Sequence, residues 1–167
     1  MATTYEAIAT VTVGSGGAAN IEFTSIPATY TDLVVKVSGR AANAANSAEL
    51  YIRFNGVATG YSSKLLYGSG SSVGSSTETT MPGLATAASD TASTFGNTEF
   101  YIPNYAGSNN KSVSTDGVSE NNATAAYQYL NAGLWSNTAA ITSIALTTNK
   151  GNFVQYSTAT LYGIKNS

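Results

Sequence analysis

The sequence of 167 residues contains no cysteine and no histidine. Without cysteine it has neither a disulfide framework nor a thiolate nucleophile. Because both residue types are missing, Ser–His–Asp and Cys–His catalytic sites are excluded. Zinc and most transition metals also lose their usual ligands. We therefore expect no metal site and no cofactor.

Charge is the second thing the sequence has little of. Charged residues make up 10% of the chain, against about 25% in typical soluble proteins. The seven basic and nine acidic residues give a net charge of −2 and form no block of one sign. Nucleic acids and membrane surfaces both attract basic patches, so we expect neither as a partner. No segment reaches the ~18 apolar residues of a transmembrane helix, and Met1–Tyr5 has no feature of a signal peptide.

Carboxylate chemistry of the glycosidase kind remains open, because it needs only two positioned Asp or Glu residues. Glu22, Glu49 and Glu99, however, fall at outward-facing positions of predicted strands. Asp32 is expected to cap a turn before a strand, and Asp116-Gly117 to form a turn or bulge. We predict that the protein is not an enzyme, and we assign no catalytic, cofactor-binding or metal-binding residue.

Small neutral residues take the place of the missing charges. Ala, Ser, Thr, Gly and Asn together supply 100 of the 167 residues. A surface built from them suits packing against copies of itself or against a partner better than solubility maintained by charge.

Apolar residues alternate with polar ones along much of the chain, for example over 32–38 and 49–55, and this period of two predicts half-buried strands. Many short strands separated by Gly-rich turns predict one domain over 1–167, an all-β, antiparallel, jelly-roll-like β-sandwich. Asn55-Gly56 is the strongest hairpin signal, since both positions of such a turn need positive φ. The predicted strands lie near 4–13, 20–25, 32–40, 48–55, 61–67, 78–84, 95–102, 111–119, 126–135, 141–148 and 153–164.

The segment from Gly68 to Thr80 is rich in Gly and Ser and has low complexity. It is predicted to be a flexible surface loop at about 68–80. The alternative is a segment that becomes ordered against a neighbouring subunit. A short helical turn at 85–89 is also open.

Eleven Tyr, five Phe and one Trp offer rings on which sugars can stack. For Trp135 we favour a place in the core of the sandwich, with tyrosine hydroxyls at its rim. Tyr51 lies on the strand face opposite Leu50 and Ile52, where contact with a ligand or partner is more credible. Tyr101 and Tyr105, which flank Pro103-Asn104, are further candidates for such contact.

Six segments resemble, in order and over nearly the whole chain, small structural proteins of tailed bacteriophages, cyanophage-like in kind. They contain the motifs F-x-S-I-P-x-T-Y-T-x-L, R-F-N-G, a Tyr-containing strand, I-x-N-Y-A before a Lys, and L-W followed by A-I-T-S-I, and they end in the closing strand. The segments are Ile21–Leu33, Tyr51–Gly56, Tyr61–Tyr67, Phe100–Ala106, Leu134–Ser136 with Ala140–Ile144, and Gly151–Ser157 through Leu161–Ile164.

The resemblance implies a virion or tail-region protein with a jelly-roll-like fold, assembled in the host cytoplasm. It brings no catalytic residue, and the few acidic residues in the loops leave less room for bound calcium than the family has. Our first hypothesis is a capsid cement or decoration protein. Such a protein sits on the outside of the shell, commonly as a homotrimer, and bridges major capsid proteins. Met1–Tyr5 is expected to reach or pair with a neighbour.

The alternative hypothesis is a tail-fibre or receptor-binding domain that recognises host-surface carbohydrate through exposed aromatics and the Asn-rich loop 104–111. Against it, a fibre head usually follows a shaft, and this sequence encodes none. A glycan-degrading enzyme is the weakest hypothesis, for want of acidic residues.

Overall fold

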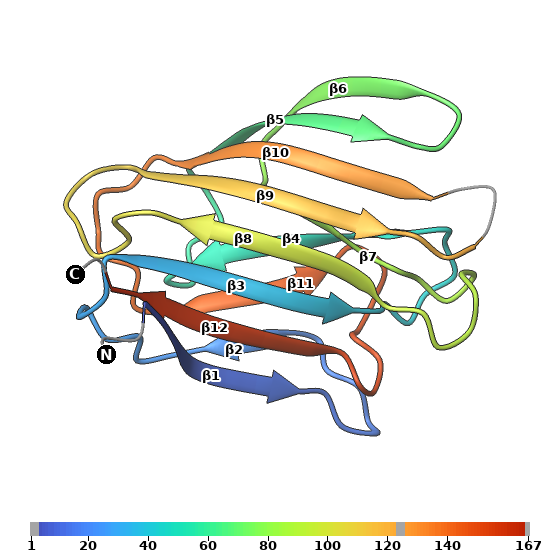
Figure 1. The fold of residues 1–167 in the computed structure, drawn as a ribbon, viewed down its shortest axis with the longest axis horizontal. Helices are drawn as coiled ribbons and strands as arrows, with labels where there is room; N and C mark the ends of the chain where they lie inside the picture. Colours follow the sequence, from blue (N-terminus) through green and yellow to red (C-terminus); the bar gives the residue numbers. More distant parts are fainter. Residues whose placement is uncertain (1–3, 123–125, 166–167) are drawn as a thin grey trace.

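The computed structural model describes residues 4–122 and 126–165, which form twelve strands and no helix (Figure 1). The predicted contact of Met1–Tyr5 with a neighbour falls largely on residues outside this range. No helix in the described residues has the length and hydropathy to cross a membrane. The strands are β1 (Tyr5–Thr12), β2 (Ile21–Phe23), β3 (Asp32–Gly39), β4 (Ala48–Phe54), β5 (Tyr61–Gly68), β6 (Val73–Glu78), β7 (Pro82–Ala85), β8 (Gly96–Ile102), β9 (Lys111–Ser119), β10 (Tyr127–Trp135), β11 (Ile144–Thr148) and β12 (Thr158–Ile164).

The strands form two antiparallel sheets packed face to face, which confirms the predicted all-β sandwich. The large sheet has the order β1-β12-β3-β8-β9-β10-β5-β6, and the small sheet has the order β2-β11-β4-β7. In Figure 1 the large sheet lies in front, and its upper strands reach beyond the small sheet. We call β9, β10, β5 and β6 the extension. It consists of the hairpins β5–β6 and β9–β10, added beside β8.

The core lies between the sheets and follows from the period of two. Alternate residues of β4 and β8 are buried and pack across the sandwich against Leu33, Val35 and Val37 of β3. Trp135 is fully buried, as predicted, with its ring stacked on Tyr61 at 6.1 Å between centroids and tilted against Phe54 at 5.4 Å. Such aromatic pairs add stability beyond the area they bury.

The Asn55-Gly56 turn exists, but the predicted hairpin does not. Both residues have positive φ, 53° and 68°, and the N–H of Val57 donates to the carbonyl of Phe54. The next strand, β5, nevertheless pairs in the large sheet, whereas β4 lies in the small one. The local turn chemistry was therefore predicted correctly, while tertiary packing decided which strand follows it.

The prediction of a flexible loop over 68–80 was wrong for its central part. Residues 73–78 form β6, which pairs with β5 in an unbroken register from Gly68↔Val73 to Ser63↔Glu78. A tight turn closes this hairpin, with the N–H of Ser69 donating to the carbonyl of Ser72. Ser and Thr suffice here because an edge strand at the margin of a sheet has no deep core to fill. The predicted strand at 78–84 is reduced to β7.

The turn or bulge predicted at Asp116-Gly117 was also wrong, because both residues lie within β9. Gly117 faces the small sheet, and a Cβ there would lie 2.9 Å from Thr98 Oγ1 and 3.0 Å from the amide nitrogen of Leu84. The glycine thus marks a close approach of the two sheets rather than a reversal of the chain.

Two predicted strands begin later than expected. β11 starts at Ile144 rather than 141, and β12 starts at Thr158 rather than 153. Ile141 and Phe153 are apolar and buried although both lie outside the strands, so their apolar character extended the predicted strands too far. The short helical turn at 85–89 is absent. Ala85 ends β7, and the N–H of Asp90 closes a turn on the carbonyl of Ala87.

Candidate interaction surface

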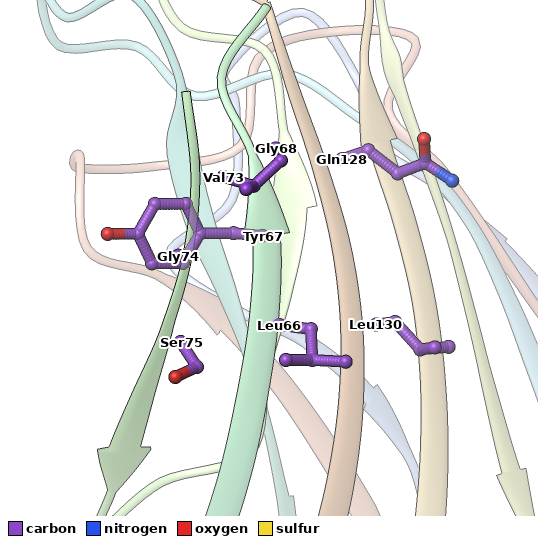
Figure 2. Close-up of a pocket in the computed structure, with 8 residues that line it drawn as sticks. All are labelled: Leu66, Tyr67, Gly68, Val73, Gly74, Ser75, Gln128 and Leu130. Carbon is purple, nitrogen blue, oxygen red and sulfur yellow. The ribbon is translucent and has the colours of Figure 1, made fainter. Parts of the chain in front are cut away.

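The outer face of the extension exposes large apolar side chains. Leu66 of β5 is 58% exposed, Leu130 of β10 is 56% exposed and Val73 of β6 is 90% exposed. Leu66 and Leu130 are direct cross-strand partners, and Val73 lies beside Gly68 on the next strand. Figure 2 shows Leu66 and Leu130 side by side on neighbouring strands. Their alternation along the strands places all three on the face turned away from the core.

These side chains line a shallow groove that runs across the extension. A hollow of about 560 Å³ lies over β6, β5 and β10, bordered by Val73 and Gln128. A second hollow, of about 720 Å³, continues toward β9 and β8 as far as Tyr101 and Pro103. The two hollows share Leu66 and Leu130 as lining residues. We call the combined feature the outer groove.

The outer groove carries little charge. Lys64 is the charged residue on its rim, and its ammonium donates to the hydroxyl of Thr77. Alanine and serine supply part of the remaining lining, as at Ala132 and Ser114. A shallow, apolar and nearly uncharged depression suits contact with a protein surface better than capture of an ion.

The remainder of the same face is arranged differently. Toward β1 it carries paired polar groups, among them the Lys36–Glu99 ion pair at 3.0 Å and the Thr10–Thr160 hydroxyl pair at 3.0 Å. Because these groups satisfy one another, the exposed leucines are a local feature of the extension rather than a property of the whole sheet.

A second cluster lies on the opposite side of the extension and combines tyrosines with carboxylates. The rings of Tyr67 and Tyr129 are 6.4 Å apart and tilted at 56°. Burial raises the pKa of Tyr129 to about 12, and the charges of Glu49 and Glu78 contribute to the rise. Because both carboxylates affect this phenol, we group Tyr51, Tyr67 and Tyr129 with Glu49 and Glu78 as the tyrosine cluster.

Tyr51 belongs to this cluster rather than standing free for contact. It is half-buried, and its hydroxyl donates to Glu49. Asn149 donates to the same carboxylate at 3.0 Å. Burial raises the pKa of the Tyr51 phenol, and its bond to Glu49 raises it further.

The other two aromatic candidates, Tyr101 and Tyr105, lie in different environments. Tyr101 lines the outer groove, and its hydroxyl donates to Asp32 at 2.9 Å. Tyr105 is fully buried, and its hydroxyl donates to the carbonyl of Pro27. Of the two tyrosines that flank Pro103-Asn104, only Tyr101 is therefore placed to contact a partner.

The acidic residues named from the sequence have separate partners. Glu99 pairs with Lys36, and Glu22 accepts a bond from Asn20. The Asp32 carboxylate accepts the N–H of Asn104 at 2.9 Å, so it holds a turn in another connection rather than its own. In residues 4–122 and 126–165, no three acidic side chains gather as a metal site would require.

Lys111 is a feature that sequence reasoning missed. It is 1% exposed, and its ammonium donates to the carbonyls of Gly107 (2.8 Å) and Asn109. Burial lowers the pKa of this lysine. Its inward position in the alternation with Val113 was the available signal.

No protein-family model matches the chain, and no curated protein matches it either. These comparisons therefore assign the chain to no family.

Proposed function

We propose that the protein is a structural subunit of a tailed-phage particle, a cement protein that binds the outside of the capsid and bridges major capsid proteins. The observation that carries this proposal is the outer groove, whose leucines lie exposed on a broad and weakly charged sheet. Covering an exposed apolar side chain stabilises a complex by about 25 cal/mol for each Å² removed from water. A groove of this kind therefore favours a protein partner.

The strand order supports the fold that this proposal includes. Strands β1-β12-β3-β8 face β2-β11-β4-β7. Along this framework the chain passes from one sheet to the other at every step except from β4 to β7, which are paired neighbours in the small sheet. Two sheets of four strands linked in this way are what two Greek keys produce. We propose that the framework is a jelly roll and that the extension was added to one of its sheets.

Low charge supports the proposal in a second way. A net charge of −2 on 167 residues gives little mutual repulsion, so many copies can lie close together on one surface. The homotrimer and the virion location expected from the resemblance stay predictions.

The first test is the copy number of the protein in purified particles, relative to the major capsid protein, by quantitative mass spectrometry. A number comparable to that of the capsid protein is expected for cement. A small fraction of it would contradict the proposal and would place the protein at the tail.

A paired variant tests the surface itself. Leu66→Ser with Leu130→Ser removes apolar area from the outer groove without adding charge. Both side chains are more than half exposed, so folding is expected to survive. We expect the occupancy on particles to fall at least about tenfold, because each lost leucine contact weakens binding by about 1 kcal/mol or more.

The matched control is Tyr156→Ser, which removes another exposed apolar residue, 68% exposed, from a loop outside the extension. Its occupancy should equal that of the wild type. Equal occupancy of the paired variant and the control would show that the outer groove is not the contact surface.

The tyrosine cluster favours carbohydrate binding at the tail as the second candidate. Rings next to carboxylate and amide groups supply both the stacking and the hydrogen bonds that sugars require. A glycan array probed with the purified protein and with Tyr67→Ala tests this alternative. Carbohydrate binding at the tail requires that the wild-type protein binds a glycan on the array and that Tyr67→Ala does not.

A further inference from the structure

The free edge of β6 is the least protected edge of the sandwich. Edge strands of natural proteins are usually shielded by a bulge, a proline, a lysine or short length, because an open edge recruits another strand. β6 has none of these devices. It spans Val73–Glu78, pairs with β5 without a shift in register, and carries a single charge at its last residue.

The other edges of the two sheets contrast with β6. β1 has a register shift between Ala7 and Ala9, and its Glu6 pairs with Lys165 at 3.2 Å. β2 has three residues. β7 has four, begins at Pro82 and is buried throughout. Only β6 among the edge strands of the described chain is both regular and open.

The register of the hairpin shows which backbone groups are free. The N–H of Ser69 donates to the carbonyl of Ser72, and bonded pairs alternate with non-bonded pairs along an antiparallel ladder. The β6 residues that bond to β5 are therefore Gly74, Ser76 and Glu78. The N–H and C=O groups of Val73, Ser75 and Thr77 point away from β5, toward the free edge.

We propose that two copies of this protein pair through β6, antiparallel and about a two-fold axis at Ser75, to form one continuous sheet. This register places Ser75 opposite Ser75 of the second copy and Val73 opposite Thr77 of the second copy. Every outward N–H and C=O of Val73, Ser75 and Thr77 then meets a partner. Registers centred elsewhere leave some of these groups unpaired.

Side chains and charges fit the same register. Val and Thr are β-branched residues that pair well across strands. The carboxylate of Glu78 falls opposite Ser72 of the second copy, so the two glutamates do not face each other. The ring of Tyr67 crosses Gly74, where a Cβ would lie 2.5 Å from its hydroxyl oxygen, and it carries that hydroxyl past β6 (Figure 2). Opposite Gly74 lies Ser76 of the second copy, which is a hydrogen-bonding partner for this hydroxyl.

The pairing also continues the outer groove. The two-fold axis of an edge-to-edge pair is perpendicular to the sheet, so the same face of both copies points the same way. Val73 borders the groove beside the free edge, and the two grooves therefore meet across the junction. Since six-residue strands bury little area, we expect a weak, concentration-dependent dimer. The inference rests on β6 and does not require the virion proposal.

Cysteine substitution tests the register directly, because the protein contains no cysteine of its own. Opposed residues of a bonded pair have Cα atoms about 5.5 Å apart, within the range that a disulfide spans. Ser75→Cys is therefore expected to form a disulfide-linked dimer under mild oxidation, measured on non-reducing gels. Thr77→Cys is the matched control, since its two copies lie about 13 Å apart in this register. A mixture of Val73→Cys and Thr77→Cys is expected to yield the mixed dimer.

Ser75→Pro tests the pairing without a crosslink. The N–H of Ser75 points away from β5, so proline at this position removes a donor from the free edge and spares the hairpin. We expect sedimentation equilibrium to show dimers of the 17.1 kDa wild-type chain and monomers of the variant. Circular dichroism confirms that both are folded.

Three results would overturn the proposal. They are equal crosslinking by Ser75→Cys and Thr77→Cys, no crosslinking by Ser75→Cys at any protein concentration, and an oligomer that Ser75→Pro leaves intact. A trimer that persists in Ser75→Pro is such an oligomer and would overturn the proposal.

Discussion

Asn55 holds its turn with both its backbone and its side chain. Its φ of 53° is a conformation that asparagine tolerates better than most residues. Its side-chain oxygen accepts the N–H groups of Thr142 (2.8 Å) and Ser143 (3.1 Å), and its amide donates to the carbonyl of Ala140 at 2.8 Å. One side chain thus fastens the end of β4 to the connection that follows β10.

We expect Asn55→Ala to destabilise the protein by about 2–4 kcal/mol, because the hydrogen bonds of the Asn55 side chain disappear and alanine is strained at positive φ. Asn55→Gly loses the same bonds without the strain, so it should be about 1 kcal/mol less destabilised. Urea denaturation of both variants measures the difference. If Asn55→Gly were as stable as the wild type, the side-chain bonds would contribute nothing.

At the scale of elements, β7 fastens the small sheet to the large one. The hydroxyl of Thr98 in β8 accepts the N–H of Leu84 and donates to its carbonyl, both at 2.8 Å. Gly96, also in β8, allows the backbones to meet, because a Cβ there would lie 2.8 Å from the Cα of Ala85. The sheets are therefore joined by direct hydrogen bonds at this end as well as by apolar packing.

Gly96→Ala should test this junction. The atoms that its methyl group would meet are backbone atoms of 85 and 86, which cannot swing aside. We expect a loss of about 1–3 kcal/mol, as for other overpacked sites. Gly14→Ala is the control, with nothing within 4 Å of its new Cβ, and should change stability by less than about 0.5 kcal/mol. Equal thermal unfolding of both variants would contradict the close approach.

The sequence predicted most of the strands because alternation reports burial directly, as it does in β4 and β8. It did not predict β6, since Ser and Gly give no alternating apolar signal. It also did not reveal which sheet the strand after Asn55-Gly56 joins, because that depends on the packing of distant segments. Of the candidate surface, Tyr51 and Tyr101 were singled out in advance. The exposed leucines were not predicted to lie on the surface, because a leucine in an alternating strand is usually expected to be buried.

At the scale of the whole molecule, buried phenols couple stability to alkaline pH. The pKa of Tyr129 is raised to about 12, first by burial and then by neighbouring carboxylates. Burial also raises the pKa of Tyr61 and of Tyr105. A group whose pKa is higher in the folded state contributes its full stability below its unfolded pKa and loses it as pH rises toward the folded value.

Stability should therefore fall as the pH rises from 10 toward 12, the window set by the unfolded and folded pKa values of Tyr129. Tyr129→Phe removes one titrating phenol, so the decline of the free energy of unfolding with pH should become less steep. Denaturant titrations at successive pH values measure it. Tyr156→Phe is the control for a phenol removed from an exposed position. An unchanged slope in Tyr129→Phe would contradict the coupling.

The position of β1 has a consequence for the time course of folding. β1 pairs with β12 alone in the described chain, from Tyr5↔Ile164 to Thr12↔Thr158. During synthesis the first strand must therefore wait for the last strand to leave the ribosome. Pairing across so long a separation is slow. The sandwich can close only after translation has passed β12. Until then the early strands stay exposed, and a chaperone or a neighbouring chain can bind them.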